Sequence, residues 1–340
     1  MKIERDQSLK AYNSLALEAQ ASALAKVNSE AELREAILWA RDNQLPLVAL
    51  GQGSNVVLAG DLSALVVLQQ GKAVAILDED KECVTLRINA GNDWHELVQW
   101  SLAQGYYGLE NLALIPGTVG AAPIQNIGAY GVEFEQFVVA VHGLQAADGE
   151  PLSLDAQACQ FAYRDSVFKH ALRDKLIITA VDIKLSKTPA VNLTYPALAT
   201  YLQDVEGQID PQRVFDAVVN IRRRRLPDPK VEPNAGSFFK NPIIAYERSA
   251  YLGLQFPALP RYPQADGGVK LSAAWLIDQC QWKGVKKTGV GVHSAHALVL
   301  VNYSSDSGKA LLALASEIKD SVSQRFGCEL EIEPRVYGSD

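Results

Sequence analysis

The sequence predicts an α+β protein made of two lobes and a third, C-terminal unit. Three observations support this fold class. Helical and strand periodicities alternate over residues 1–70, and strand-like alternation dominates the stretch after them. That stretch fits lobes joined by antiparallel strands better than one doubly wound parallel sheet. The tetrapeptide Leu226-Pro227-Asp228-Pro229 then ends a helical pattern and marks a boundary.

The first lobe, residues 1–70, is predicted from a helix followed by a strand. Ser29 and Glu32 have the spacing of a capping box, in which a hydroxyl and a carboxylate satisfy the first N–H groups of a helix. Apolar residues then recur at helical spacing from Leu33 to Ala40. Pro46 ends that helix, and residues 47–50 are expected to form a short buried strand.

The second lobe, residues 71–226, is predicted to be richer in strands. Residues 84–88 and 181–185 alternate between apolar and polar side chains, with the period of half-buried strands. Asp93 is expected to cap a helix that runs to Gly105, and Asp148-Gly149 is typical of a hairpin turn. Asp210-Pro211 begins another helix, with aspartate as its cap and proline at its first position.

The third unit, residues 227–328, shows a helical pattern near residues 273–279 and a strand pattern at 297–302. A last helix carries apolar residues in register from Leu311 to Val322. The final segment, residues 329–340, contains a short extended stretch and is assigned back to the second lobe, at the active site.

Composition excludes several classes of function. The formal net charge is −7, and a nucleic-acid-binding protein would normally show a basic face. No apolar run approaches the ~18 residues of a membrane helix, and the N-terminus lacks the apolar stretch of a signal peptide. The four cysteines form no CxxC pair and the five histidines show no HExxH spacing, so we expect no bound metal.

Two loops rich in glycine are candidates for ligand binding. Gly51-Gln52-Gly53-Ser54-Asn55 directly follows the strand predicted at residues 47–50, and its glycines let backbone N–H groups approach a pyrophosphate. By itself this loop is equally consistent with a structural turn. Residues 111–131 hold four glycines and no charged side chain. Such a segment is costly to order, which favours contact with a flat ligand. A buried crossover loop is the alternative interpretation.

These loops belong to a longer series of motifs. In chain order the series is Gly51-Gln52-Gly53-Ser54-Asn55, residues 116–131, Tyr163-Arg164-Asp165-Ser166, Leu226-Pro227-Asp228-Pro229-Lys230, residues 234–242 and Gln264-Ala265-Asp266-Gly267. Together they resemble the UDP-N-acetylenolpyruvoylglucosamine reductase family, over nearly the whole chain. Asn192-Leu193-Thr194-Tyr195 is similar to the tyrosine loop of the longer subclass of that family.

The resemblance implies a fold and a reaction. The fold is a two-lobed FAD-binding domain of the vanillyl-alcohol-oxidase (PCMH) type, followed by an α+β substrate-binding domain. NADPH reduces non-covalently bound FAD, and the hydride then passes from flavin N5 to C3 of enolpyruvyl-UDP-N-acetylglucosamine. Protonation at C2 gives UDP-N-acetylmuramate, a precursor of peptidoglycan. The cofactor supplies the redox chemistry, so the protein has to position the substrate and protonate it.

The resemblance also implies which residues bind FAD. They are Gly51, Gln52, Gly53, Ser54, Asn55, Pro116, Gly117, Thr118, Gly120, Ala121, Ala122, Ile124, Gln125, Ile127, Gly128 and Arg164.

Three residues are the candidates for catalysis. Ser237 is expected to donate the proton, because its flanking glycine and phenylalanines suit a site from which water is excluded. Arg164 matches the arginine of the family's active site and would stabilise charge on the substrate carboxylate, although a surface ion pair with Asp165 is the alternative. Glu333 is the candidate glutamate. Glu331 is its fallback, because Pro334 departs from the family pattern.

Contacts with the substrate are carried over from the same resemblance. They are Tyr195, Arg225, Asn241, Tyr262, His296 and Lys240, with Lys240 also a candidate for attracting NADPH. Arg225 replaces a lysine found in the family, and His296 stands where some relatives have glutamine. The arginines at residues 222–225 are candidates for binding a diphosphate, and the alternative for residues 222–224 is a solvated helix end.

Two other functions are weighed against the reductase. An FAD-linked alcohol or sugar oxidase would often attach its flavin through histidine or cysteine, and the two glycine-rich loops contain neither. A flavin- or UDP-sugar-binding protein without catalysis would have no need of Ser237 as a proton donor. We expect a cytoplasmic monomer that acts on small molecules and binds neither nucleic acid nor membrane.

Overall fold

The computed structural model describes residues 1–338 and confirms the predicted α+β class. The chain divides into two compact units. Unit 1 comprises Met1–Gln7, Ala21–Gln52 and Ser63–Arg224, and unit 2 comprises Ser8–Gln20, Gly53–Leu62 and the chain from Arg225 onward. The finer division into two lobes at residue 70 stays a prediction. Of the segment assigned to residues 329–340, Ser339 and Asp340 lie outside the described residues.

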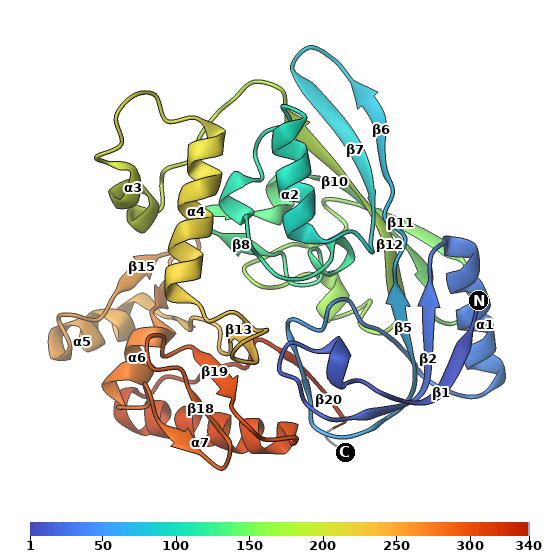
Figure 1. Ribbon diagram of the computed structural model, residues 1–340. Helices are drawn as coiled ribbons and strands as arrows, with labels where there is room; N and C mark the ends of the chain where they lie inside the picture. The colour runs from blue at the N-terminus through green and yellow to red at the C-terminus, as the bar shows by residue number, and fades with distance from the viewer. Residues whose placement is uncertain (339–340) are drawn as a thin grey trace. The chain divides into compact units, whose positions relative to one another are not determined.

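Unit 1 holds two large sheets (Figure 1). The four-stranded sheet has the order β1-β2-β5-β3, with β1 (Ile3–Ser8), β2 (Gln20–Val27), β3 (Leu47–Ala49) and β5 (Leu62–Gln69). The five-stranded antiparallel sheet has the order β11-β10-β12-β7-β6, with β6 (Val74–Glu79), β7 (Cys83–Asn89), β10 (Val138–Gln145), β11 (Pro151–Asp155) and β12 (Leu176–Ser186). A small hairpin joins β8 (Gly128–Ala129) to β9 (Val132–Glu133). The β10–β11 turn lies where Asp148-Gly149 predicts it, and Gly149 has a φ of +76°.

The four α-helices described in unit 1 are α1 (Glu30–Asp42), α2 (Trp94–Ala103), α3 (Pro196–Leu202) and α4 (Pro211–Arg225), with short 3-10 turns at Glu110–Leu112, Val119–Ala121, Phe134–Gln136 and Val167–Lys169. Three of the four, α1, α2 and α4, begin where their caps predict. Ser29 caps α1 through the N–H of Glu32, and the Glu32 carboxylate reaches back to the N–H of Asn28, one residue earlier than in a standard capping box. Asp93 caps α2 through the N–H of Glu96.

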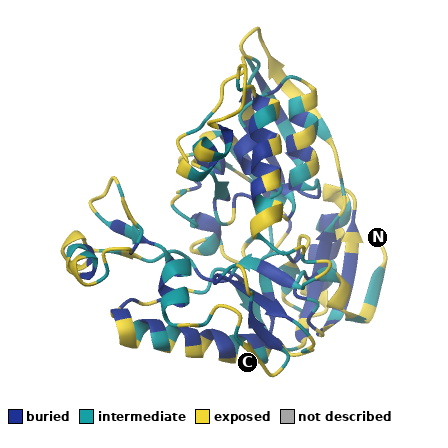
Figure 2. Cartoon of the chain, turned by 60° about the vertical axis from the view of Figure 1, so that its left-hand side comes forward, coloured by how far each residue is buried: buried dark blue, intermediate teal, exposed yellow. Residues whose placement is uncertain are grey.

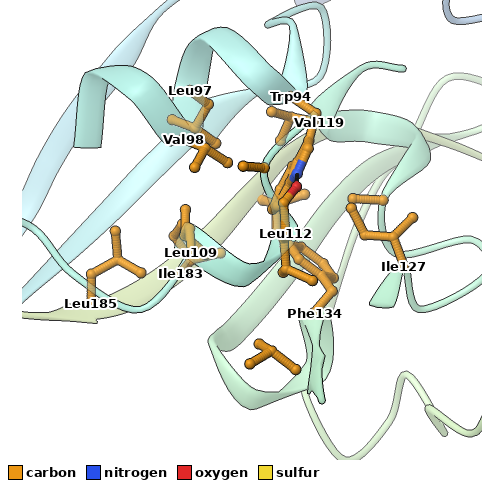
Figure 3. Close-up of a cluster of buried hydrophobic side chains, with 14 of the residues drawn as sticks. Trp94, Leu97, Val98, Leu109, Leu112, Val119, Ile127, Phe134, Ile183 and Leu185 are labelled. Carbon is orange, nitrogen blue, oxygen red and sulfur yellow. Dashed lines mark hydrogen bonds between the residues drawn. The ribbon is translucent and has the colours of Figure 1, made fainter. Parts of the chain in front are cut away.

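The main core of unit 1 lies between the five-stranded sheet and helices α2 and α4. Figure 3 shows its centre, where Leu97 and Val98 of α2 lie near Ile183 and Leu185 of β12. The Trp94 ring packs edge-to-face on Phe134 at 5.5 Å, and its N–H donates to the carbonyl of Leu112 at 2.9 Å. This core fixes α2 and the loop after it, from which the site is built.

Unit 2 contains a four-stranded sheet of order β13-β19-β18-β17, a three-stranded sheet of order β14-β16-β15, and the parallel pair β20-β4. Its strands are β4 (Val56–Leu58), β13 (Asn234–Ser237), β14 (Ile243–Ile244), β15 (Arg261–Pro263), β16 (Val269–Leu271), β17 (Lys286–Lys287), β18 (Val290–Val292), β19 (Val299–Asn302) and β20 (Arg335–Tyr337). Its helices are α5 (Tyr246–Gln255), α6 (Ala273–Gln279) and α7 (Gly308–Phe326), with a 3-10 turn at Lys10–Tyr12.

Burial follows the sheets in both units, and the helices alternate between buried and exposed faces (Figure 2). In α7, Leu311, Leu314, Ile318 and Val322 are buried, as their spacing predicts. Within residues 1–338, no helix combines the length and the hydropathy needed to cross a membrane.

Candidate active site

The two glycine-rich loops meet in unit 1. The side chain of Gln52 bridges them, because its amide donates to Asp93 at 2.5 Å while its oxygen accepts from the N–H of Gly117 at 3.1 Å. A Cβ on Gly51 would lie 2.8 Å from the hydroxyl oxygen of Thr118, so glycine allows this close approach. The helix cap at Asp93 therefore holds residues 51–52 against residues 117–118.

The rest of the second loop is fixed by buried polar groups. Asn126 is fully buried and donates to Glu133 and to the carbonyl of Ala162, both at 3.2 Å. Ser166, from the Tyr163-Arg164-Asp165-Ser166 motif, donates to the carbonyl of Ile124 at 2.6 Å. The loop is thus an ordered surface with bonds to the motif that follows it.

The remainder of the first loop, Gly53 to Asn55, belongs to unit 2. Gly53 has a φ of +62°, and a Cβ there would collide with the carbonyl of Tyr12. The hydroxyl of Ser14 donates to the carbonyl of Ser54 at 3.3 Å, and the carbonyl of Asn55 accepts from the N–H of Arg335 at 3.0 Å. The glycine at 53 is therefore required by backbone conformation and close packing.

Arg164 rests on the second loop. Its guanidinium donates to the carbonyl of Gly128 at 2.6 Å and to that of Asn126 at 3.4 Å. Asp165 pairs with His170 at 2.7 Å, so the alternative of an Arg164–Asp165 ion pair gains no support. Arg164 also has a φ of +54°, an uncommon conformation for a side chain of its size.

Arg222, on α4, is a residue that the sequence interpretation missed. Its Nε is buried and has no hydrogen-bond partner among residues 1–338. Burial lowers the pKa of Arg222, and the charge of Arg164 acts in the same direction. The solvated helix end predicted for residues 222–224 is right for the exposed Arg223 and Arg224 and wrong for Arg222. Two arginine charges close together indicate a site for an anionic or acceptor-bearing group.

Tyr195 immediately precedes α3 and is 41% exposed. Its ring packs edge-to-face on Tyr130, with centroids 5.3 Å apart. Arg225, the last residue of α4, is exposed and belongs to unit 2.

Ser237 ends β13 in unit 2 and pairs with Val299 of β19. Gly236 before it has a φ of +70°, with nothing within 4 Å of the position of a Cβ. Phe238 and Phe239 after it are buried, at 0% and 1% exposed. The serine therefore has an open approach on one side and an apolar anchor on the other.

The two candidate glutamates have different surroundings. The N–H of Glu333 donates to the carbonyl of Phe238 at 3.0 Å, which places Glu333 across from the residue next to Ser237. Glu331 is exposed and forms an ion pair with Lys240. Glu333 therefore stays the candidate glutamate and Glu331 its fallback.

The other candidates of unit 2 lie on three separate elements. Asn241 accepts from the N–H of Ala273 at 2.9 Å, at the start of α6. Tyr262, on β15, is 49% exposed. The Nδ1 of His296 accepts from the N–H of Leu298 at 3.3 Å. Burial lowers the pKa of His296, and the charges of Arg225 and His293 lower it further.

One of these observations fits a polar cofactor. The buried Nε of Arg222 lacks a partner within residues 1–338, and a ligand oxygen or nitrogen would supply it.

Comparison with known proteins agrees with this chemistry. The "FAD binding domain" family matches residues 21–155, and the "UDP-N-acetylenolpyruvoylglucosamine reductase, C-terminal domain" family matches residues 228–337. The chain is 44% identical to the UDP-N-acetylenolpyruvoylglucosamine reductase of Pseudomonas aeruginosa, over 99% of each chain. It is 43% identical to that of Escherichia coli K12, over 98% of this chain and 96% of the relative.

A solved structure supports the fold. The reductase of the same name from Thermus caldophilus superposes with a TM-score of 0.69 at 24% identity and covers 99% of each chain.

Proposed function

Because the chain belongs to the UDP-N-acetylenolpyruvoylglucosamine reductase family, we propose that it reduces enolpyruvyl-UDP-N-acetylglucosamine to UDP-N-acetylmuramate with electrons from NADPH. This is an oxidoreductase step of peptidoglycan precursor synthesis. The observation that carries the proposal is the match over nearly the whole length of chains that bear this name. FAD, held by the two glycine-rich loops, would supply the transfer of a hydride from NADPH to C3 of the substrate.

The two glycine-rich loops are proposed to bind FAD. Gly51 and Gln52 lie against residues 117–118 in unit 1, and Gly53, Ser54 and Asn55 lie beside Ser14 in unit 2. Their backbone N–H groups suit a diphosphate. Arg222 is added to the candidates from the sequence, since its buried Nε calls for an acceptor.

Ser237 is the proposed donor of the proton to C2. A serine hydroxyl is a weak acid, so it can act only on a strongly basic centre from which water is kept away. The buried Phe238 and Phe239 hold the Ser237 backbone in place, and Gly236 leaves one side open. Arg164 and Glu333 are proposed to stabilise the charge that grows on the substrate carboxylate.

Tyr195, Arg225, Asn241, Tyr262 and His296 are proposed to contact the UDP-sugar. Arg225 supplies a charge for the diphosphate, and the lowered pKa of His296 favours a neutral ring at pH 7, able to donate from Nε2. Lys240 is the weakest of the candidates because it pairs with Glu331. A monomer in the cytoplasm, where NADPH and nucleotide sugars are made, completes the proposal.

An anaerobic flavin spectrum tests the proposal. NADPH should bleach the flavin absorbance, and enolpyruvyl-UDP-N-acetylglucosamine should restore it without oxygen. Recovery with oxygen alone would indicate an oxidase, and a protein that takes up no FAD would contradict the whole proposal.

The variant Ser237→Ala separates the roles. It should bleach at the wild-type rate but recover about 10²–10⁴ times more slowly, the usual contribution of a positioned acid. Ser305→Ala, which removes a serine hydroxyl bonded to the carbonyl of Ser307, is the control and should behave as the wild type. Recovery of Ser237→Ala at the wild-type rate would remove Ser237 from the mechanism.

A further inference from the structure

Asn111 is a buried amide that joins two segments far apart in the sequence. It is 2% exposed, and its Nδ2 donates to the carbonyl of Tyr130 and to that of Asn192, at 2.9 Å each. Asn192 lies three residues before Tyr195. The side chain therefore holds the base of the Tyr195 loop (residues 192–195) against residue 130.

Further hydrogen bonds hold the Tyr195 loop above that point. The Oδ1 of Asn192 accepts from the N–H of Thr194 at 3.0 Å and from its hydroxyl at 2.7 Å. A Cβ on Gly131 would lie 2.6 Å from the Thr194 hydroxyl oxygen, and the φ of Gly131 is +84°. The loop is thus packed directly on residues 130–131, and the Tyr195 ring lies on that of Tyr130.

Residues 128–131 also support Arg164. The guanidinium of Arg164 donates to the carbonyl of Gly128, two residues before Tyr130. Residues 128–131 therefore carry Arg164 at one end and the Tyr195 loop at the other. Asn111 bonds to this segment and to the loop at once.

We propose that Asn111 is a positioning residue for Tyr195, which it keeps in place to close over the UDP-sugar. The inference rests on the role of Tyr195 in the proposed function. Only a neutral side chain with two N–H donors can serve two carbonyls at this position, whereas aspartate would place a charge against them. Without Asn111 the loop has to be ordered each time substrate binds, which weakens binding and spares the chemical step.

A double-mutant cycle on the holoenzyme tests this. Asn111→Leu keeps the size of the side chain and removes both donors, and Tyr195→Ala removes the ring. We expect each single variant to raise KM for enolpyruvyl-UDP-N-acetylglucosamine about tenfold, with kcat within about twofold. The double variant should have the KM of Tyr195→Ala, because Asn111 acts only through that ring.

Asn92→Leu is the matched control. The Nδ2 of Asn92 also donates to two carbonyls of unit 1, those of Asn89 at 2.9 Å and Ala73 at 3.2 Å, but it does not contact the Tyr195 loop. It should lower the melting temperature without changing KM. If Asn111→Leu does not fold, Asn111→Ser, which keeps one donor, and Gly131→Ala, which displaces Thr194, should raise KM in the same way.

Three results would overturn the inference. Effects of Asn111→Leu and Tyr195→Ala that multiply in the double variant would mean that the two residues act separately. A wild-type KM in Asn111→Leu would mean that the loop needs no anchor. A wild-type KM in Tyr195→Ala would contradict both the inference and the assignment of Tyr195. If that variant still reduces the substrate, the rest of the proposed function is unaffected.

Discussion

Two regions of unit 1 that contain arginine differ in whether the arginine side chain has a partner of opposite charge. On the five-stranded sheet, Arg87 of β7 donates to both oxygens of Asp182 on β12, at 2.7 Å each. His142 of β10 contacts the same carboxylate at 2.8 Å, and Ser153 of β11 contacts His142 at 2.7 Å. We call these four residues the sheet cluster.

At the candidate site the arrangement is the reverse. Arg222 lies near another cation, Arg164, and its buried Nε lacks a partner within residues 1–338. The sheet cluster is produced by strand register, since Arg87 is directly opposite Asp182 and His142 is opposite Ser153. A cluster whose donors and acceptors satisfy one another stabilises the fold. A buried donor without a partner destabilises the protein, and a ligand that accepts its hydrogen bond removes that cost.

The variant Arg222→Met offers the strongest test of this difference. We expect kcat/KM to fall about 100-fold, because losing a charged hydrogen bond to the bound cofactor costs about 1.5–3 kcal/mol. The apoprotein should become more stable by about 1 kcal/mol, because an apolar side chain replaces a buried charge. Arg87→Met is the matched control and should do the opposite, with full activity and about 2 kcal/mol less stability. Steady-state kinetics and urea unfolding measure both, and equal losses of stability would place Arg222 with the structural arginines.

Sequence periodicity held enough information to predict most of the elements but not this distinction. The caps at Ser29 and Asp93, the alternation in β7, and the apolar stripe of α7 are local patterns, and the structure confirms them. The alternation predicted for residues 181–185 is wrong at Asp182, which is buried. Four consecutive arginines look alike when they are read as charge. The helical phase does separate them, because Arg222 follows the buried Val214 and Val218 at successive intervals of four residues.

Other parts of the site depend on contacts between distant segments. The bridge from Gln52 to Asp93, the pairing of β20 with β4 and the two bonds of Asn111 each join residues that no local pattern relates. The resemblance to a family supplied the names of site residues, such as Ser237 and Glu333, without this geometry. It could not supply the partner of Lys240, because an ion pair depends on where the C-terminal segment lies.

Acid should weaken the sheet cluster. Burial alone would raise the pKa of Asp182, but its hydrogen bonds to Arg87 and His142 and their charges together lower it. A carboxylate with a lowered pKa in the folded state stabilises the protein above the pKa of the unfolded chain, about 3.9. That stabilisation is lost as the pH falls below this value, through the pKa of the folded state.

The variant Asp182→Asn tests that expectation. It should cost about 2 kcal/mol of unfolding free energy at pH 7, with kcat unchanged, and the difference from the wild type should shrink as the pH falls below about 4. Urea unfolding at several pH values measures it. A cost that stays constant down to pH 3 would show that the charge of Asp182 is not what stabilises the cluster.

Ser153 gives the smallest expected effect and the sharpest contrast. Ser153, His142 and Asp182 are connected as in a hydrolase triad, with hydroxyl, imidazole and carboxylate in hydrogen-bond contact. Both oxygens of Asp182 are already bonded to Arg87, so the carboxylate has little capacity left to make His142 a stronger base. Ser153 is also exposed, so its hydroxyl exchanges readily with water. We therefore expect Ser153→Ala to change the unfolding free energy by less than about 1 kcal/mol and to leave reductase activity unchanged. A fluorophosphonate probe should not label Ser153 in the wild type. Labelling that is lost in Ser153→Ala and in His142→Ala would show that a reactive serine can arise from strand register alone, and it would end the distinction between the two regions.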